Sequence, residues 1–125
     1  MILIFGGAHQ GKLDFAKENF DISEDDIFFC SENTALDFSK KVIANAELFF
    51  LKCVREGLSP KEVLAENRSA LAHKIIIARD ISQGIVPVEP EFRAWREAAG
   101  RAMMYLAKES SEVYRIFCGL AHKLK

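Results

Sequence analysis

The amino-terminal stretch MILIFGGAHQGKLD restricts the fold more than any other part of the chain. Its apolar run, Ile2–Phe5, is typical of a short buried strand. A glycine-rich segment, Gly6–Gly11, separates that strand from Lys12, and a helix-compatible run extends from Leu13 to Asn19. Strand, glycine loop, lysine and helix in this order are the layout of a phosphate-binding loop, in which backbone N–H groups and the helix amino end face one anion.

The loop fits the phosphate-binding signature GxxxxGK[ST] at every position but the last, where Leu13 replaces the hydroxyl residue. That hydroxyl ordinarily binds Mg²⁺, so we expect the loop to hold phosphate and to hold Mg²⁺ poorly. An ordinary glycine-rich turn with a surface lysine is the alternative. The predicted nucleotide-binding residues are Gly6, Gly7, Ala8, His9, Gln10, Gly11, Lys12 and Leu13.

Composition is typical of a single globular domain, and we treat residues 1–125, half of them hydrophobic, as one P-loop-like unit. The net charge of −1 gives no footprint for nucleic acid, and no apolar run has the length of a membrane span. The amino terminus lacks the basic and apolar regions of a signal peptide. The three cysteines are far apart, which argues against a disulfide framework or zinc cluster and favours a reduced, cytoplasmic protein.

The periodicity of apolar residues predicts alternating strands and helices. Strands are expected at 2–5, 27–30, 75–78 and 112–118, and helices at 13–19, 34–55, 59–71 and 91–109. This alternation predicts an α/β fold of the P-loop type with three layers. We expect a mostly parallel sheet of about four to five strands with helices on both faces.

Within the expected helix 34–55, Phe38, Leu48 and Leu51 fall outside the apolar stripe. These residues fit two interpretations: a helix covered on most of its surface, or a contact between subunits. The next helix has a clear start, with Ser59 as N-cap and Pro60 at the first helical position.

The run Ile75–Ala78 is β-branched and lacks alternating polar residues, which predicts a central strand buried on both faces. In open α/β sheets, ligands bind beyond the carboxyl ends of such strands. The chain that follows this strand is therefore a candidate substrate loop. Its predicted residues are Asp80, Gly84, Pro87 and Arg93.

Three segments, MILIFGGAHQGK, ARDISQGIVPVEPEFRAWREAAGR and SSEVYRIFCGLAHKLK, together resemble the adenosylcobinamide kinase/adenosylcobinamide-phosphate guanylyltransferase family. The resemblance implies a P-loop α/β protein that assembles as a homotrimer. It also implies phosphoryl transfer from ATP or GTP, with Mg²⁺, to a cobinamide hydroxyl, followed by guanylyl transfer through a histidine. Asp80 stands in the place of a family glutamate, and Arg93 and Arg96 stand in the places of family arginines.

The chain departs from the family pattern at four points. Leu13 replaces the hydroxyl residue, and the segment with the guanylyl-accepting histidine has no counterpart, with the short connection 20–27 as the expected place of its loss. If 27–30 is the family's second strand, Phe29 replaces its metal-binding aspartate, and Met103 replaces a helix asparagine. His9 is the one histidine near the expected phosphates, and a loop residue with an exposed imidazole is its simpler interpretation.

Three functions remain open at this stage. The first is a kinase in which Lys12 and Asp80 are catalytic and a cobinamide-type corrinoid is the substrate. The second is a non-catalytic relative that binds nucleotide, phosphate or corrinoid. The third is a domain that kept the fold for assembly alone. Replacement metal ligands are also open, with the candidates Asp14, Asp25 and Asp26.

Overall fold

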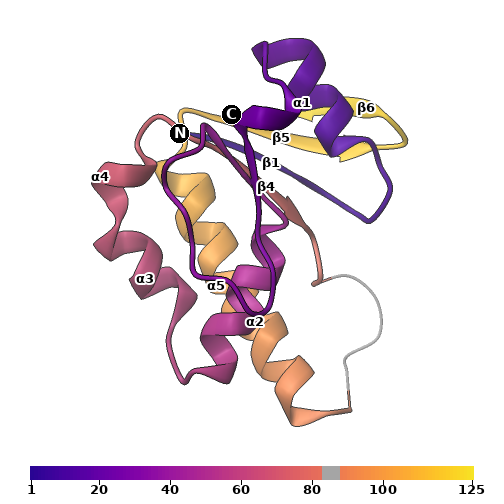
Figure 1. Ribbon diagram of the computed structural model, residues 1–125. Coiled ribbons are helices and arrows are strands. Elements are labelled where there is room, and N and C mark those ends of the chain that lie inside the picture. The colour runs from indigo at the N-terminus through magenta and orange to yellow at the C-terminus, as the bar shows by residue number, and fades with distance from the viewer. Residues whose placement is uncertain (83–87) are drawn as a thin grey trace.

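The computed structural model describes residues 1–82 and 88–125 and shows a twisted sheet covered by helices on both faces (Figure 1). Within the described residues the sheet has six strands in the order β2-β3-β4-β1-β5-β6. The strands are β1 (Ile2–Gly6), β2 (Ile27–Phe29), β3 (Val42–Ala44), β4 (Ile75–Arg79), β5 (Glu112–Phe117) and β6 (Leu120–Lys123). All neighbouring pairs are parallel except β5 and β6. The α/β class and the mostly parallel sheet are confirmed, with one strand more than expected.

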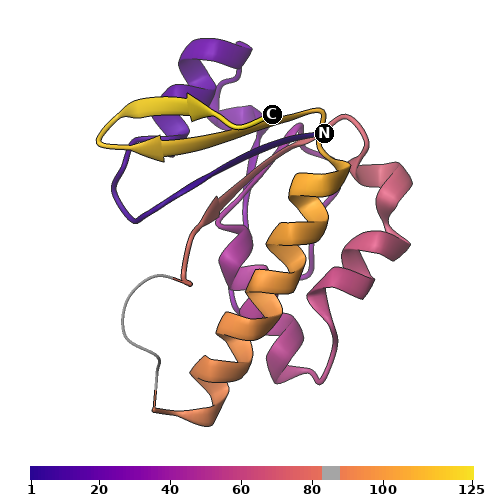
Figure 2. The same cartoon turned by 180° about the vertical axis from the view of Figure 1, so that it is seen from behind.

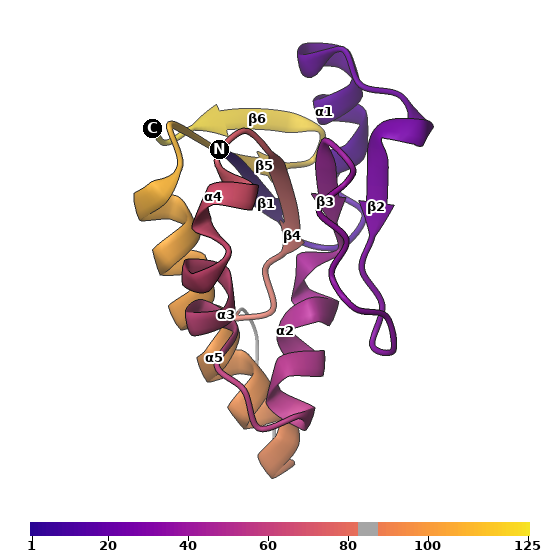
Figure 3. The same ribbon diagram turned by 60° about the vertical axis from the view of Figure 1, so that its left-hand side comes forward.

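The helices divide into two layers. They are α1 (Lys12–Phe20), α2 (Ala46–Arg55), α3 (Pro60–Glu66), α4 (Arg68–Leu71) and α5 (Pro90–Glu109), with a 3₁₀ turn, η1, at Glu24–Asp26. Helix α1 lies on one face of the sheet and α2–α5 lie on the other (Figures 1 and 3). Among the described residues, none of the helices combines the length and apolar character needed to cross a bilayer.

Successive side chains of β1 point to opposite faces of the sheet and contribute to two separate hydrophobic cores. Leu3 points into the core beneath α2–α5, whereas Ile4 points into the core beneath α1. Strand β4 pairs with β1 from Ile75 opposite Ile2 onward, and its residues Ile75–Ala78 are buried. The prediction of a central strand buried on both faces is confirmed, because apolar side chains on both sides of the sheet need cover.

The predicted helix 34–55 is wrong in its first half. Residues 31–41 form no regular element, Val42–Ala44 is a strand, and α2 begins at Ala46. The physical reason is that β3 pairs with both β2 and β4, which buries all three of its residues. Asn45 then reverses the chain with a φ of 56°, in the left-handed region that asparagine tolerates.

The three residues outside the predicted stripe have ordinary packing roles. Leu51 is 2% exposed, and Leu48 and Phe38 are partly buried against the core beneath α2–α5. The prediction of one apolar stripe along residues 34–55 is wrong because only the α2 part of this stretch is helical. Phe38 instead contacts the core from the irregular segment before β3. These residues therefore no longer support a contact between subunits, and the oligomeric state stays a prediction.

The structure also tests the predicted start and end of the helix at 59–71. The side chain of Ser59 accepts a hydrogen bond from the Glu62 amide, which confirms it as the N-cap of α3. The expected helix 59–71 is interrupted at Asn67, and α4 follows as one short turn. At the end of the chain, Cys118 and Gly119 turn β5 into β6, a strand that was not predicted (Figure 2).

Two of the cysteines, Cys30 and Cys53, lie in the core beneath α2–α5 and give a test of its packing. Burial raises the pKa of Cys30 to about 12 and the pKa of Cys53 to about 11, whereas Cys118 is exposed in the β5–β6 turn. Because the thiolate is the reactive form, maleimide should modify Cys118 rapidly in the native protein and the other two only after denaturation. Mass spectrometry of wild type and Cys118→Ser checks this, and rapid native labelling of the Cys118→Ser variant would contradict the packing.

Candidate functional site

The glycine loop joins β1 to α1 in a tightly curved conformation. His9 has a φ of 56° and Gly11 a φ of 93°, so two residues of the loop are in the left-handed region. Gly11 is the N-cap of α1, and no described side chain caps that helix end. The first turn of a helix has N–H groups without intrahelical partners, and these groups attract anions. The loop therefore joins β1 to an uncapped helix start, and its binding of phosphate stays a prediction.

A cavity of about 450 Å³ lies against this loop. Its lining includes the loop from Ala8 to Asp14 and residues from β3, α2 and β4. The residues that sequence reasoning missed are Ala44, Asn45, Glu47, Ile77 and Arg79. They meet here because parallel strands carry their carboxyl ends to the same edge of the sheet. Gly6 and Gly7 are outside the lining and form the entry to the loop.

Lys12 is the partly buried cation of this cavity. Its Nζ donates a hydrogen bond of 2.7 Å to the carbonyl oxygen of Gly7, so the side chain folds back over the loop. Burial lowers the pKa of Lys12, the charge of Arg79 lowers it further, and the carboxylate of Glu47 opposes both effects. An ammonium has three donors, and this hydrogen bond uses one of them.

Glu47 is a buried carboxylate on the first turn of α2, 7% exposed. Its Oε1 accepts a 2.8 Å hydrogen bond from the backbone N–H of Arg79, and its carbonyl oxygen accepts one of 2.8 Å from Trp95 Nε1. These two bonds join α2 to the end of β4 and to α5. The available sequence signal was an acidic residue within an apolar helix stretch, which is rare unless the carboxylate has partners.

Gln10 connects the loop to the carboxyl-terminal hairpin. Its carbonyl oxygen accepts a 2.9 Å hydrogen bond from the Gly119 amide, and its Oε1 accepts one from the Cys118 amide. Gly11 approaches the same turn so closely that a Cβ there would lie 3.4 Å from the Cα of Gly119. The loop is thus supported by a segment more than a hundred positions away in the chain.

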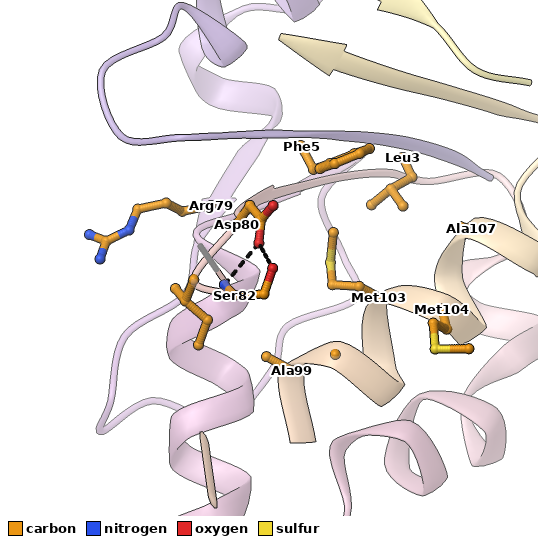
Figure 4. A pocket seen from close by; sticks show the side chains of 11 residues that line it. Leu3, Phe5, Arg79, Asp80, Ser82, Ala99, Met103, Met104 and Ala107 are labelled. Carbon is orange, nitrogen blue, oxygen red and sulfur yellow. Dashed lines mark hydrogen bonds between the residues drawn. The ribbon is translucent and has the colours of Figure 1, made fainter. Parts of the chain in front are cut away.

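Asp80 lies at a different cavity, of about 370 Å³, on the α5 side of the sheet (Figure 4). Its Oδ1 accepts hydrogen bonds from the amide of Ser82, at 2.9 Å, and from the Ser82 hydroxyl, at 2.5 Å. The remaining lining is largely apolar and includes Leu3, Phe5 and Met103. Lys12 and Asp80, the two predicted catalytic residues, therefore do not line one cavity.

The other predicted substrate-loop residues are only partly described. Gly84 and Pro87 lie outside the described residues. Arg93 is exposed on α5 and lines a third, open cavity with Ser82, which also borders the Asp80 cavity. Asp80 and Arg93 thus line different cavities, and Ser82 lines both.

The oxygen-bearing side chains that line the loop cavity include those of Asp14, Asn45 and Glu47, and the expected metal-binding position is not among them. Phe29 was expected at a metal-binding position, but it ends the edge strand β2, is 41% exposed and does not line the cavity. The strand that reaches the cavity is β3, which ends in Ala44 and Asn45.

The candidate replacement ligands are also dispersed. Of Asp14, Asp25 and Asp26, only Asp14 lines the cavity, and the other two lie in η1. Among residues 1–82 and 88–125, no group of three histidine, cysteine, aspartate or glutamate side chains is placed to hold a metal ion.

Comparison with known proteins gives one family. The family model described as cobinamide kinase / cobinamide phosphate guanyltransferase matches residues 52–124, which is more than half of the chain. The matched part runs from within α2 to the end of β6 and begins after the glycine loop. A comparison with curated proteins gives no match.

Proposed function

Since the chain belongs to the cobinamide kinase / cobinamide phosphate guanyltransferase family, we propose that its glycine loop binds the phosphate groups of ATP or GTP. The observation that carries the proposal is the cavity at residues 8–14, which joins the amino end of α1 to the ammonium of Lys12. Backbone N–H groups at a helix amino end and a lysine are the elements by which such loops hold polyphosphate.

The roles of the residues follow from their positions. Gly11 has a φ that side-chain-bearing residues rarely adopt, so the loop amides can turn toward one anion. Lys12 releases the Gly7 carbonyl and moves its charge to the terminal phosphates when the ligand enters. Gln10 keeps the loop against the β5–β6 turn during this exchange.

Guanylyl transfer is not part of the proposal. The family resemblance implies that guanylyl transfer uses a histidine, and the segment that carries this histidine has no counterpart in the sequence. The histidine of the loop, His9, is exposed. Phosphoryl transfer to a cobinamide hydroxyl is the second candidate function. It is favoured by one observation, the 2.8 Å hydrogen bond from the Asp80 amide to the Gly6 carbonyl oxygen, which attaches the substrate loop to the phosphate loop.

Isothermal titration calorimetry with ATP and with GTP tests the proposal. We expect saturable binding of at least one of them, and competition by inorganic triphosphate because the loop contacts phosphates rather than the base. Absence of heat and of competition with both nucleotides, in Mg²⁺ and in EDTA, would contradict the proposed function.

A parallel assay separates the two candidate functions. The protein is incubated with adenosylcobinamide, ATP or GTP and Mg²⁺, with an active family member as control. A phosphorylated corrinoid would establish the kinase, whereas binding without product would support a nucleotide-binding relative. The separation of Lys12 from Asp80 leads us to expect binding without product.

A further inference from the structure

The cavity at the loop is lined by two cations, Lys12 and Arg79, and by the carboxylates of Asp14 and Glu47. Phosphoryl groups in loops of this type are ordinarily neutralised by Mg²⁺ as well as by lysine. Here the hydroxyl position is Leu13, and the described lining does not bring three acidic, histidine or cysteine side chains together: Asp14 and Glu47 are its two carboxylates, and Glu47 already accepts the Arg79 N–H. A polyphosphate in this cavity needs another source of positive charge.

Arg79 is placed to supply this positive charge. It is the last residue of β4, next to β1 in the sheet, and it lines the cavity together with Lys12. Its charge is close enough to Lys12 to lower the pKa of that residue, against the larger and opposite effect of the Glu47 carboxylate. Two cations that face one cavity repel each other, and an anion between them would relieve the repulsion.

The backbone of Arg79 is fixed while its side chain is free to act. The buried Glu47 accepts its N–H at 2.8 Å, which holds the point where the side chain leaves the strand. Within residues 1–82 and 88–125, the guanidinium forms no hydrogen bond or ion pair, whereas Arg55 pairs with two glutamates. Figure 4 shows the Arg79 side chain extending away from the methionines of the apolar cavity.

We propose that Arg79 takes the place of the divalent cation, so that the cavity binds a nucleoside triphosphate as the metal-free anion between Arg79 and Lys12. This inference rests on the proposed function and adds to it the form of the ligand. A guanidinium presents several donors in a planar fork and binds phosphate in bidentate fashion, which suits it to this role. Glu47, which also lines the cavity, then acts as a positioning residue, because its carboxylate holds the backbone N–H of Arg79.

Calorimetry with GTP and with ATP in EDTA and in Mg²⁺ tests the inference on four proteins. They are the wild type, Arg79→Ala, Arg79→Lys and the control Arg115→Ala, which removes an exposed arginine from β5 outside the loop cavity. In wild type and control we expect affinity in EDTA to equal or exceed affinity in Mg²⁺. Arg79→Ala should bind metal-free nucleotide roughly 10- to 100-fold more weakly, the range for a lost hydrogen bond between charged groups.

The metal dependence of the variant is the readout that a merely structural role would not change. Mg²⁺ carried by the nucleotide should restore part of the affinity of Arg79→Ala, because it neutralises the same phosphates. Arg79→Lys should keep an intermediate affinity, and thermal unfolding curves confirm that all four proteins fold.

The remaining outcomes distinguish a failure of the proposed role of Arg79 from a failure of the proposed nucleotide binding. Wild-type binding that requires Mg²⁺, or equal affinity of wild type and Arg79→Ala, would overturn the role of Arg79 and leave the proposed function in place. No wild-type binding under either condition would overturn the proposed function itself.

Discussion

Replacing Gly6 by alanine should destabilise the protein by about 3 kcal/mol, the upper part of the range for inserting a methyl group into a closely packed core. A Cβ at Gly6 would lie 2.3 Å from the carbonyl oxygen of Ile116 on the neighbouring strand β5. The obstacle is backbone, so the overlap cannot be removed by rotating a side chain. Strands β1 and β5 would have to separate at the point where the loop begins.

Gly100→Ala is the matched control. Gly100 lies within α5, and a Cβ there meets nothing within 4 Å. That substitution should stabilise the protein by roughly 0.5–1 kcal/mol, because alanine is a better helix former than glycine. Urea unfolding of both variants measures the difference. Equal stability of Gly6→Ala and wild type would show that β1 and β5 are not packed as described.

Lys12→Met should abolish most nucleotide binding while keeping the volume of the side chain. Loss of a charged donor to phosphate corresponds to an affinity roughly 10- to 100-fold lower. Binding to the wild type should also weaken as pH rises, because only the ammonium form attracts phosphate. The pKa of Lys12 lies below its ordinary value, so this loss should begin at a lower pH than for an exposed lysine.

The control for this variant is Lys17→Met on the same helix. Lys17 forms an ion pair with Glu24 and does not line the loop cavity. Its replacement should leave the calorimetric affinity unchanged, since exposed ion pairs contribute little. If the two variants bind nucleotide equally well, Lys12 has no special role and the anion lies elsewhere.

The separation of Lys12 and Asp80 affects whether this chain can transfer a phosphoryl group. They lie at two cavities divided by the end of β4, and Arg79 borders both cavities. Phosphoryl transfer depends on bringing the terminal phosphate and the acceptor hydroxyl together. Because Lys12 and Asp80 do not line one cavity, we expect nucleotide binding without phosphoryl transfer.

Local chemistry was readable from the sequence alone. The apolar run before Gly6, the glycines and Lys12 specify a strand, a curved loop and a helix start through short-range sterics and hydrogen bonding. The uninterrupted β-branched character of Ile75–Ile77 identified the central strand in the same way. Ser59 identified a helix start, because an N-cap needs only its own hydroxyl and an amide three residues later.

Only the tertiary structure decided which distant residues meet. Val42–Ala44 lies in a stretch with helical spacing, and pairing with both β2 and β4 makes it a strand. That pairing brings Glu47 and Arg79 to the loop and leaves Phe29 at the sheet edge. No local pattern contains this information, because the convergence of parallel strand ends depends on strand order rather than on spacing along the chain.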